Sequence, residues 1–212
     1  MATSTLKSDG TGDYVSMITW ETAKQGTLSE PEILECFKGT TVNDGWQADG
    51  SLQESVSVAD WVTTPTNNII IRAAAGENHG GVPGVGFRLV GDFTTALSCT
   101  VDNTVIEDIS LESTAGDFNA GSPLIGNGNN CLYQRLIGIR SGGAINTSRS
   151  TFYTSAGSGG TRNTFRNCLA IGGYGGFVSI IGTSNPIYEN CTAVAYGDFG
   201  FVTGSDLSLI HI

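Results

Sequence analysis

The stretch Phe165-Arg-Asn-Cys-Leu-Ala-Ile171 returns as Tyr188-Glu-Asn-Cys-Thr-Ala-Val194, 23 positions later. Each copy places an aromatic residue first, a charged residue second and Asn-Cys after it. A repeat of this length is too short for a pair of helices and contains few helix-forming residues. It therefore predicts one coil of a β-solenoid, in which each coil packs on the next.

Two earlier segments, Ile106–Leu111 and Tyr133–Gly138, align with the two copies without gaps. In each segment an apolar residue is followed by two polar residues and then by alternation, which is typical of a strand, a turn and a second strand. The residues predicted to face inward form three columns: Ile106, Tyr133, Phe165 and Tyr188; Ile109, Leu136, Cys168 and Cys191; Leu111, Gly138, Ala170 and Ala193.

Equivalent positions in neighbouring coils should touch, because parallel strands lie about 4.8 Å apart. This spacing predicts three cross-coil pairs: Asp108 with Arg135, Asn167 with Asn190, and Arg166 with Glu189. The predicted outward column is Ser110, Ile137, Leu169 and Thr192. Its two large apolar members indicate cover by a loop or by another subunit.

The N-terminal segment divides into an irregular stretch and one helix. Residues 1–12 are rich in Ser, Thr, Gly and Asp, and we expect no regular structure there. Apolar residues then recur at helical spacing from Tyr14 to Ala23, with Ser16 as a candidate N-cap and Gly26 as a stop. Such a helix would cover the open end of the first coil; a partner-binding helix is the alternative.

Strands are predicted at 31–37, 55–62, 68–72 and 87–90, with a glycine-rich loop at 73–86 and a longer, protruding loop at 141–161. The continuous apolar run at 68–72 suggests a strand buried on both faces. We accordingly divide the chain into an N-terminal segment with a capping helix (residues 1–29) and β-helix coils (residues 30–206).

Composition restricts the classes of function. The 212 residues carry a formal net charge of −10, which disfavours binding to nucleic acid or to anionic membranes. No apolar run approaches the length of a membrane span, and no secretory signal precedes the coils. The five cysteines have neither an even count nor metal-binding spacing, so we predict buried thiols and neither disulfides nor a zinc site.

The last six residues, Leu207-Ser-Leu-Ile-His-Ile212, break with the preceding composition. They match one reading frame of the end of a transposon-based sequencing adapter. We therefore expect residues 207–212 to be read-through and the β-helix to be truncated at its C-terminus. Sequencing across the locus tests this expectation, since a continuous genomic frame encoding the hexapeptide would contradict it.

The aligned coils resemble the right-handed parallel β-helices of the pectate-lyase-like family over roughly residues 30–205. The segments Gly12–Ser16, Asp60–Thr64 and Ile69–Gly76, with His79 and Gly80, are similar to the entry segment of phage-type and environmental β-helix repeat proteins. The resemblance implies tail-fibre, tailspike or adhesin roles, often as trimers that bind or cleave glycans. It implies a fold and not a chemistry.

No catalytic constellation is visible. His79 stands alone in a glycine-rich loop, and His211 belongs to the last six residues. Adjacent carboxylates such as Glu107 and Asp108 should point to opposite faces of a strand. The other candidates are three acidic residues near coil turns, one acidic pair, and four arginines without an evident partner: Asp92, Asp102 and Asp117; Glu189 with Asp198; Arg72, Arg88, Arg140 and Arg162.

Two further motifs carry little weight. Asn146-Thr-Ser148 and Asn190-Cys-Thr192 match the glycosylation pattern, and we interpret both as accidental. Glycine-rich loops such as Gly157–Gly160 lack the strand-to-helix context of a phosphate cradle.

The sequence therefore predicts a structural or glycan-binding β-helix of a phage tail fibre, tailspike or bacterial surface protein. The alternative is a polysaccharide lyase or glycoside hydrolase whose active site lies largely outside this chain. The sequence identifies no catalytic residue, no cofactor and no metal site, and it leaves open whether the protein is an enzyme. Polysaccharide is the expected partner, a homotrimer an expected assembly, and a virion or the extracellular space the expected location.

Overall fold

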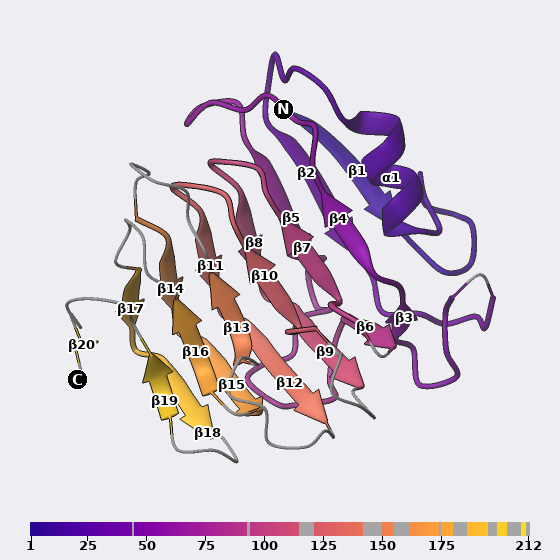
Figure 1. The fold of residues 1–212 in the computed structure, drawn as a ribbon. Helices are drawn as coiled ribbons and strands as arrows, with labels where there is room; N and C mark the ends of the chain where they lie inside the picture. The colour runs from indigo at the N-terminus through magenta and orange to yellow at the C-terminus, as the bar shows by residue number, and fades with distance from the viewer. Residues whose placement is uncertain are drawn as a thin grey trace.

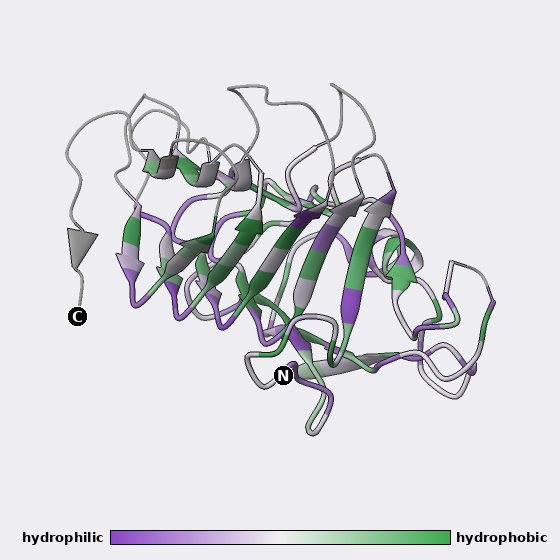
Figure 2. Ribbon diagram, turned by 90° about the horizontal axis from the view of Figure 1, so that it is seen from below, coloured by the Kyte–Doolittle hydropathy of each residue, from purple (hydrophilic) through white to green (hydrophobic). Residues whose placement is uncertain are grey.

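The computed structural model describes residues 1–43, 45–92, 94–114, 121–141, 150–154, 162–173, 175–179, 186–194, 199–202 and 209–210. Three parallel sheets wind along one axis (Figure 1; seen from below in Figure 2). Each complete coil contributes one strand to each sheet, and the first and last strands of the chain belong to the first sheet alone. The chain is a parallel β-helix with a short helix at its N-terminal end, as the sequence predicts.

The first sheet has eight strands: β1 Ala2–Leu6, β2 Glu32–Cys36, β5 Ile69–Ala73, β8 Val105–Glu107, β11 Leu132–Gln134, β14 Thr164–Arg166, β17 Ile187–Glu189 and β20 Leu209–Ile210. The second sheet has six: β3 Leu52–Gln53, β6 Arg88–Asp92, β9 Ser110–Thr114, β12 Ile137–Ser141, β15 Leu169–Gly172 and β18 Thr192–Val194. The third sheet also has six: β4 Val56–Val58, β7 Leu97–Cys99, β10 Leu124–Gly126, β13 Ser150–Thr154, β16 Gly175–Ser179 and β19 Phe199–Val202.

The predicted register of the inward columns is confirmed. Tyr133 pairs with Ile106 on one side and with Phe165 on the other, and Phe165 pairs with Tyr188. Their rings stack along the axis, with centroids 4.8 Å apart for Tyr133 and Phe165 and 5.5 Å apart for Phe165 and Tyr188. Neighbouring coils therefore share one continuous aromatic core.

Gly138 shows why the third inward column holds only small residues in the later coils. A Cβ atom added to Gly138 would lie 2.6 Å from the ring of Phe152 and 2.6 Å from the methyl group of Thr151. Leu111 fills the same column one coil earlier, where it pairs with Gly138. The large residues of the third sheet thus take the space that the second sheet leaves free.

The helix α1, Met17–Lys24, confirms the predicted N-terminal helix. Ser16 caps it by accepting a hydrogen bond at its hydroxyl from the amide of Thr19, at 3.3 Å. Met17 and Trp20 are fully buried, and the Trp20 ring lies 5.4 Å from that of Trp61. Figure 1 shows α1 at the N-terminal end of the solenoid, where it covers the core.

The expectation of irregular structure at residues 1–12 is wrong for β1, which pairs in parallel with β2 along its whole length. Ser4 and Leu6 point inward and are buried. The Ser4 hydroxyl donates to the carboxylate of Glu32 at 2.7 Å. A polar strand forms here because a neighbouring strand satisfies its backbone and a buried carboxylate accepts its hydroxyl.

Three other strand predictions need correction. The predicted strand at 55–62 is reduced to β4, because Asp60 turns the chain with a positive φ of 62°. The strand β5 is buried on one face only, since Ile70 and Arg72 are half exposed. The predicted loop at 141–161 contains β13, which pairs with β10 and β16; the remainder of that loop lies outside the described residues.

The predicted cover over the outward column comes from the loop after β5. His79, a buried residue of this loop, bonds the Arg135 carbonyl through its ring at 2.6 Å, two residues before Ile137. Ser110 and Ile137, the first two members of the column, are buried, whereas Leu169 is half buried and Thr192 exposed. The loop thus covers the N-terminal half of this column.

Candidate functional site

The outer face of the first sheet carries a column of charged and polar side chains. Glu35, Arg72, Glu107, Gln134, Arg166 and Glu189 occupy equivalent positions in successive coils. Arg72 contacts Glu35 at 2.6 Å, and the predicted pair Arg166–Glu189 is confirmed at 2.5 Å. Both pairs are partly exposed, so each contributes at most about 1 kcal/mol to stability.

The turns after these strands adopt left-handed backbone. Asp108, Arg135, Asn167 and Asn190 have φ between 51° and 62°, and two predicted turn pairs are confirmed there. Arg135 contacts Asp108 at 2.7 Å, and the Asn190 amide donates to the Asn167 side-chain oxygen at 2.7 Å. Asn tolerates this conformation better than most residues because its short side chain can hydrogen-bond locally.

The prediction that Glu107 and Asp108 point to opposite faces is wrong. Glu107 ends β8, and the left-handed turn at Asp108 rotates the next side chain toward the same guanidinium. Arg135 therefore contacts Glu107 at 2.9 Å as well as Asp108 at 2.7 Å. Alternation of side chains holds only while the backbone stays extended.

A depression of about 320 Å³ lies beside the charged column. Its lining comes from β2, β5, the following loop and the end of β8: Glu35, Arg72, Ala73, Ala74, Ala75, Asn78, Glu107 and Asp108. Glu35 and Glu107 lie two coils apart, about 10 Å at the spacing of parallel strands. Each carboxylate already contacts an arginine, so neither is available as a free base.

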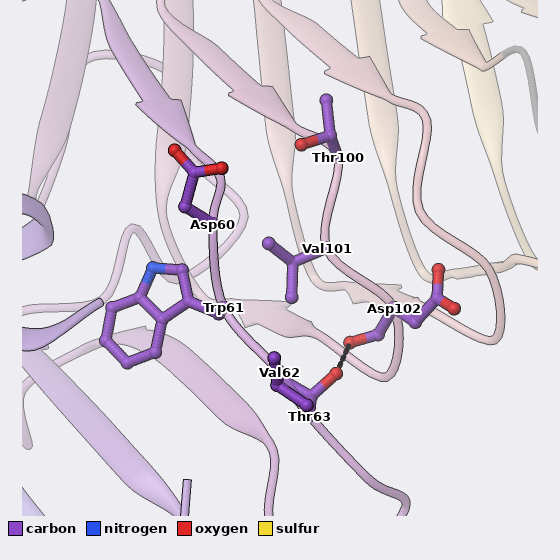
Figure 3. Close-up of a pocket in the computed structure, with 7 residues that line it drawn as sticks. All are labelled: Asp60, Trp61, Val62, Thr63, Thr100, Val101 and Asp102. Carbon is purple, nitrogen blue, oxygen red and sulfur yellow. Dashed lines mark hydrogen bonds between the residues drawn. The ribbon is translucent and has the colours of Figure 1, made fainter. Parts of the chain in front are cut away.

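A second depression, of about 330 Å³, lies between two successive turns from the third sheet to the first (Figure 3). It is lined by Asp60, Trp61, Val62, Thr63, Thr100, Val101 and Asp102. The Thr63 hydroxyl donates to the Asp102 carbonyl at 2.7 Å and joins the two turns. Figure 3 shows the Asp60 and Asp102 carboxylates at opposite ends of the depression.

Two residues that line this second depression, Asp102 and Trp61, are held in place by hydrogen bonds. The Asp102 carboxylate accepts hydrogen bonds from the backbone and side-chain amides of Asn129, at 2.8 and 3.1 Å. Trp61 is only 7% exposed, and its indole nitrogen donates to Glu21 at 3.3 Å. The depression therefore offers hydroxyl and carboxylate groups but no open aromatic face.

The four arginines without an evident partner in the sequence are not alike. Arg72 belongs to the charged column, and Arg140 is buried on the inner side of β12. Arg88 contacts Glu112 and Asp49, each at 2.7 Å, and these contacts raise its pKa. Arg162 is exposed before β14. The prediction that Arg72 and Arg88 are unpaired is thus wrong.

Of the predicted acidic groupings the structure describes only Asp92, Asp102 and Glu189, and it does not bring Asp92 and Asp102 together. Asp92 ends a strand of the second sheet and accepts from the Thr114 hydroxyl at 2.9 Å, whereas Asp102 lies between the third sheet and the first. Asp117 and Asp198 lie outside the described residues, as does the glycosylation pattern at Asn146. Glu189 is occupied by Arg166.

His79 has a structural environment. It is 6% exposed, its Nδ1 accepts from the Gly81 amide at 2.9 Å, and its Nε2 donates to the Arg135 carbonyl. The interpretation of His79 as a structural loop residue fits these contacts, because both ring nitrogens hold backbone groups.

The cysteines form two neighbouring pairs and one single residue, and all five are free thiols. Cys168 and Cys191 follow successive turns, as the sequence predicts, and burial raises the pKa of the Cys168 thiol. Cys99 and Cys131 both approach the Val101 carbonyl, at 3.7 and 3.3 Å. A buried thiol with a raised pKa is a poor nucleophile.

Within the described part of the chain, no group of three or more His, Cys, Asp or Glu side chains is arranged to hold a metal ion. No helix among those same residues has the length and apolarity needed to cross a membrane. Comparison with protein-family models and with curated protein sequences finds no match to this chain.

The ion pairs that sequence reasoning missed include two sets on the coils: Glu35 with Arg72, and Asp49 with Arg88 and Glu112. The signal for the first was present, because Ile33–Cys36 and Ile70–Ala73 share the alternation of the later coils. Extending the coil alignment toward the N-terminus would have placed Glu35 beside Arg72. The second set depends on Asp49, which lies in a loop and has no coil register.

Proposed function

We propose that the chain is a non-catalytic β-helix of a phage tail fibre, tailspike or bacterial surface protein. In this proposal it serves as a rigid spacer and contacts polysaccharide at the depression lined by Asp60–Thr63 and Thr100–Asp102. One observation carries the proposal: the described coils stack in unbroken register, with side chains paired from coil to coil, as a spacer requires.

The ion-pair contacts of the carboxylates in the charged column support the non-catalytic part of the proposal. A glycosidase needs two carboxyl groups facing one substrate bond, about 5–9.5 Å apart, one of which holds a transferable proton. Glu35, Glu107 and Glu189 each contact an arginine from a neighbouring coil. Such carboxylates hold coils together rather than transfer protons.

Glycan contact at the second depression is supported by its size and chemistry. A volume of about 330 Å³ is at the lower end of small-ligand sites. Threonine hydroxyls and carboxylates match the donors and acceptors of sugar hydroxyl groups. Because Trp61 is buried, no ring can stack on a sugar, and we expect weak binding. The net charge of −10 favours neutral over anionic polysaccharides.

Calorimetric titration with a panel of neutral and anionic oligosaccharides tests binding. Asp60→Asn should abolish binding, since it removes the charge but keeps a residue that tolerates left-handed backbone. Asp92→Asn is the matched control, because Asp92 ends β6 in the second sheet and does not line this depression. Equal binding by both variants, or no binding by the unaltered chain to any oligosaccharide, would remove the glycan-binding part of the proposal.

Incubation of the same polysaccharides with the chain, followed by detection of new reducing or unsaturated ends, tests the non-enzymatic part. We expect no turnover with or without calcium. Metal-dependent cleavage would favour the alternative, a polysaccharide lyase or glycoside hydrolase, which otherwise stays a prediction. The homotrimer and the virion or extracellular location also stay predictions.

A further inference from the structure

The outer face of the first sheet carries two parallel columns over its strands β5, β8, β11, β14 and β17. The charged column over these five coils reads Arg72, Glu107, Gln134, Arg166 and Glu189. Two positions earlier on each strand lies a second column, four of whose five members are aliphatic and which we call the aliphatic column: Ile70, Val105, Leu132, Thr164 and Ile187. All five members of the aliphatic column are half buried, so this face is partly apolar and open.

Over the five coils from β5 to β17, the charged column has a sign order that is complementary to its own reverse. Its sixth member, Glu35 on β2, falls opposite β20 when β11 is the centre. From β5 to β17 the signs run positive, negative, neutral, positive, negative. A second copy laid face to face with its axis reversed about β11 places Arg72 opposite Glu189 and Glu107 opposite Arg166. By symmetry each of these contacts occurs twice, which gives four opposite-charge contacts and no like-charge contact. Gln134 meets its own counterpart at the centre.

We propose that a second copy of this chain docks on this face, related by a two-fold axis that runs along β11, as the alternative to the homotrimer that the family resemblance implies. A rotation about the strand direction reverses the order of the coils but keeps each column over its own kind. The aliphatic column therefore packs on the aliphatic column, with Val105 opposite Thr164 and Leu132 opposite itself. Such a self-complementary interface is the commonest one among soluble homo-oligomers.

Neighbouring registers fit less well. An axis halfway between β8 and β11 would bring Arg72 against Arg166, and an axis at β8 would bring Glu107 against itself. An axis halfway between β11 and β14 would bring Glu107 against Glu189. Like charges placed opposite each other disfavour an alignment. An axis halfway between β5 and β8 avoids like charges but has only two opposite-charge contacts, both between Arg72 and Glu107.

Arg135 belongs to the central coil, where its charge would meet its own copy. Its guanidinium does not lie on the axis, because it reaches back to Asp108 and Glu107 in the preceding coil. The two guanidinium groups are thereby displaced in opposite directions, by about one strand spacing each. Their charges are also balanced by these two carboxylates.

The size of the face predicts a weak dimer. Five strands span about 19 Å, and three residues of each strand span about 10 Å. This area is smaller than the roughly 800 Å² per partner of a standard interface. Sedimentation velocity over a concentration series should therefore show a monomer–dimer equilibrium. Salt should weaken the dimer, since the Debye length falls from about 10 Å at 0.1 M to about 3 Å at 1 M.

A charge exchange between two variants tests the sign order. The acidic variant carries Arg72→Glu and Arg166→Glu, and the basic variant carries Glu107→Lys and Glu189→Lys. Each variant alone should dimerise about tenfold or more weakly than the unaltered chain, because like charges then meet. An equimolar mixture should restore the dimer, which a general folding defect could not produce. Failure of the mixture to associate, with both variants folded by circular dichroism, would overturn the proposal.

Cysteine cross-linking tests the register. Two sheets packed face to face lie about 10 Å apart, too far for a disulfide, so a bismaleimide with a spacer of about that length should link Leu132→Cys into a dimer. Val105→Cys and Thr164→Cys should cross-link when mixed and far less when each is treated separately. The unaltered chain controls for its own thiols, and Ser57→Cys, exposed on the third sheet, controls for random collision. A trimer, a monomer at all concentrations, or equal cross-linking by Ser57→Cys would contradict the two-fold axis.

Discussion

Replacement of Phe165 by alanine tests whether the aromatic core joins the coils into one cooperative unit. Phe165 is 1% exposed, and its ring lies 4.8, 5.8, 5.6 and 5.5 Å from the rings of Tyr133, Phe152, Phe177 and Tyr188. Removing a buried phenylalanine ring costs about 3–5 kcal/mol, and this site is at the upper end because four ring contacts are lost at once.

Urea unfolding followed by circular dichroism gives the measurement. With a slope of about 3 kcal/mol per M, Phe165→Ala should lower the midpoint by roughly 1.3–1.7 M. Phe201→Ala is the control, because Phe201 is only half buried and, among the rings of the described residues, contacts those of Phe177 and Tyr188. Phe165→Leu should recover more than half of the loss. A loss below about 1 kcal/mol for Phe165→Ala, or one equal to that of Phe201→Ala, would refute the reasoning.

Two further predictions concern the turns and loops. The Ser51 hydroxyl, the Ser51 amide and Arg88 lower the pKa of Asp49 from 3.8 to about 2. The stability from ionised Asp49 is complete above about pH 4 and is lost as the pH falls toward 2, so Asp49→Asn should flatten the decline of the urea midpoint over this range. At Asn167, with φ of 54°, replacement by glycine should cost about 1 kcal/mol less than replacement by alanine, because only glycine enters left-handed backbone freely. Equal midpoints for the two Asn167 variants, or an unchanged pH dependence in Asp49→Asn, would contradict these predictions.

The sequence predicted the later coils residue by residue. From Ile106 onward it predicted the inward columns and the pairs Asp108–Arg135, Asn167–Asn190 and Arg166–Glu189. These predictions succeeded because residues that lie one repeat apart in the sequence of a solenoid lie side by side on neighbouring strands. A repeat therefore carries long-range information that an ordinary fold does not show in its sequence.

The N-terminal coils were harder to predict. The strand β1 is built from Ser and Thr, and it forms a strand because β2 pairs with it and Glu32 accepts the Ser4 hydroxyl. No periodicity in residues 1–12 reveals that partner. The grouping of Glu107 with Asp108 was likewise missed, because one left-handed residue cancels the alternation that a strand predicts.

The two depressions could not be derived from the sequence at all. Asp60 and Asp102 are brought to one depression by turns in successive coils, and only the loop lengths between those turns decide how the side chains meet. The sequence alignment showed only the part of the charged column that begins at Glu107. The position of Arg72 beside Glu107, and with it the sign order, became evident from the pairing of β5 with β8.

The sequence by itself determined that this chain is a β-helix, which residues face its core, and which neighbours pair from coil to coil. It could do so because the repeat fixes the register, and the register fixes the contacts. Tertiary structure alone decided which loop covers the outward column, where the depressions lie, and how the two columns combine into one surface. These features arise where the chain leaves the repeat, and there the contacts depend on the path of each loop in space.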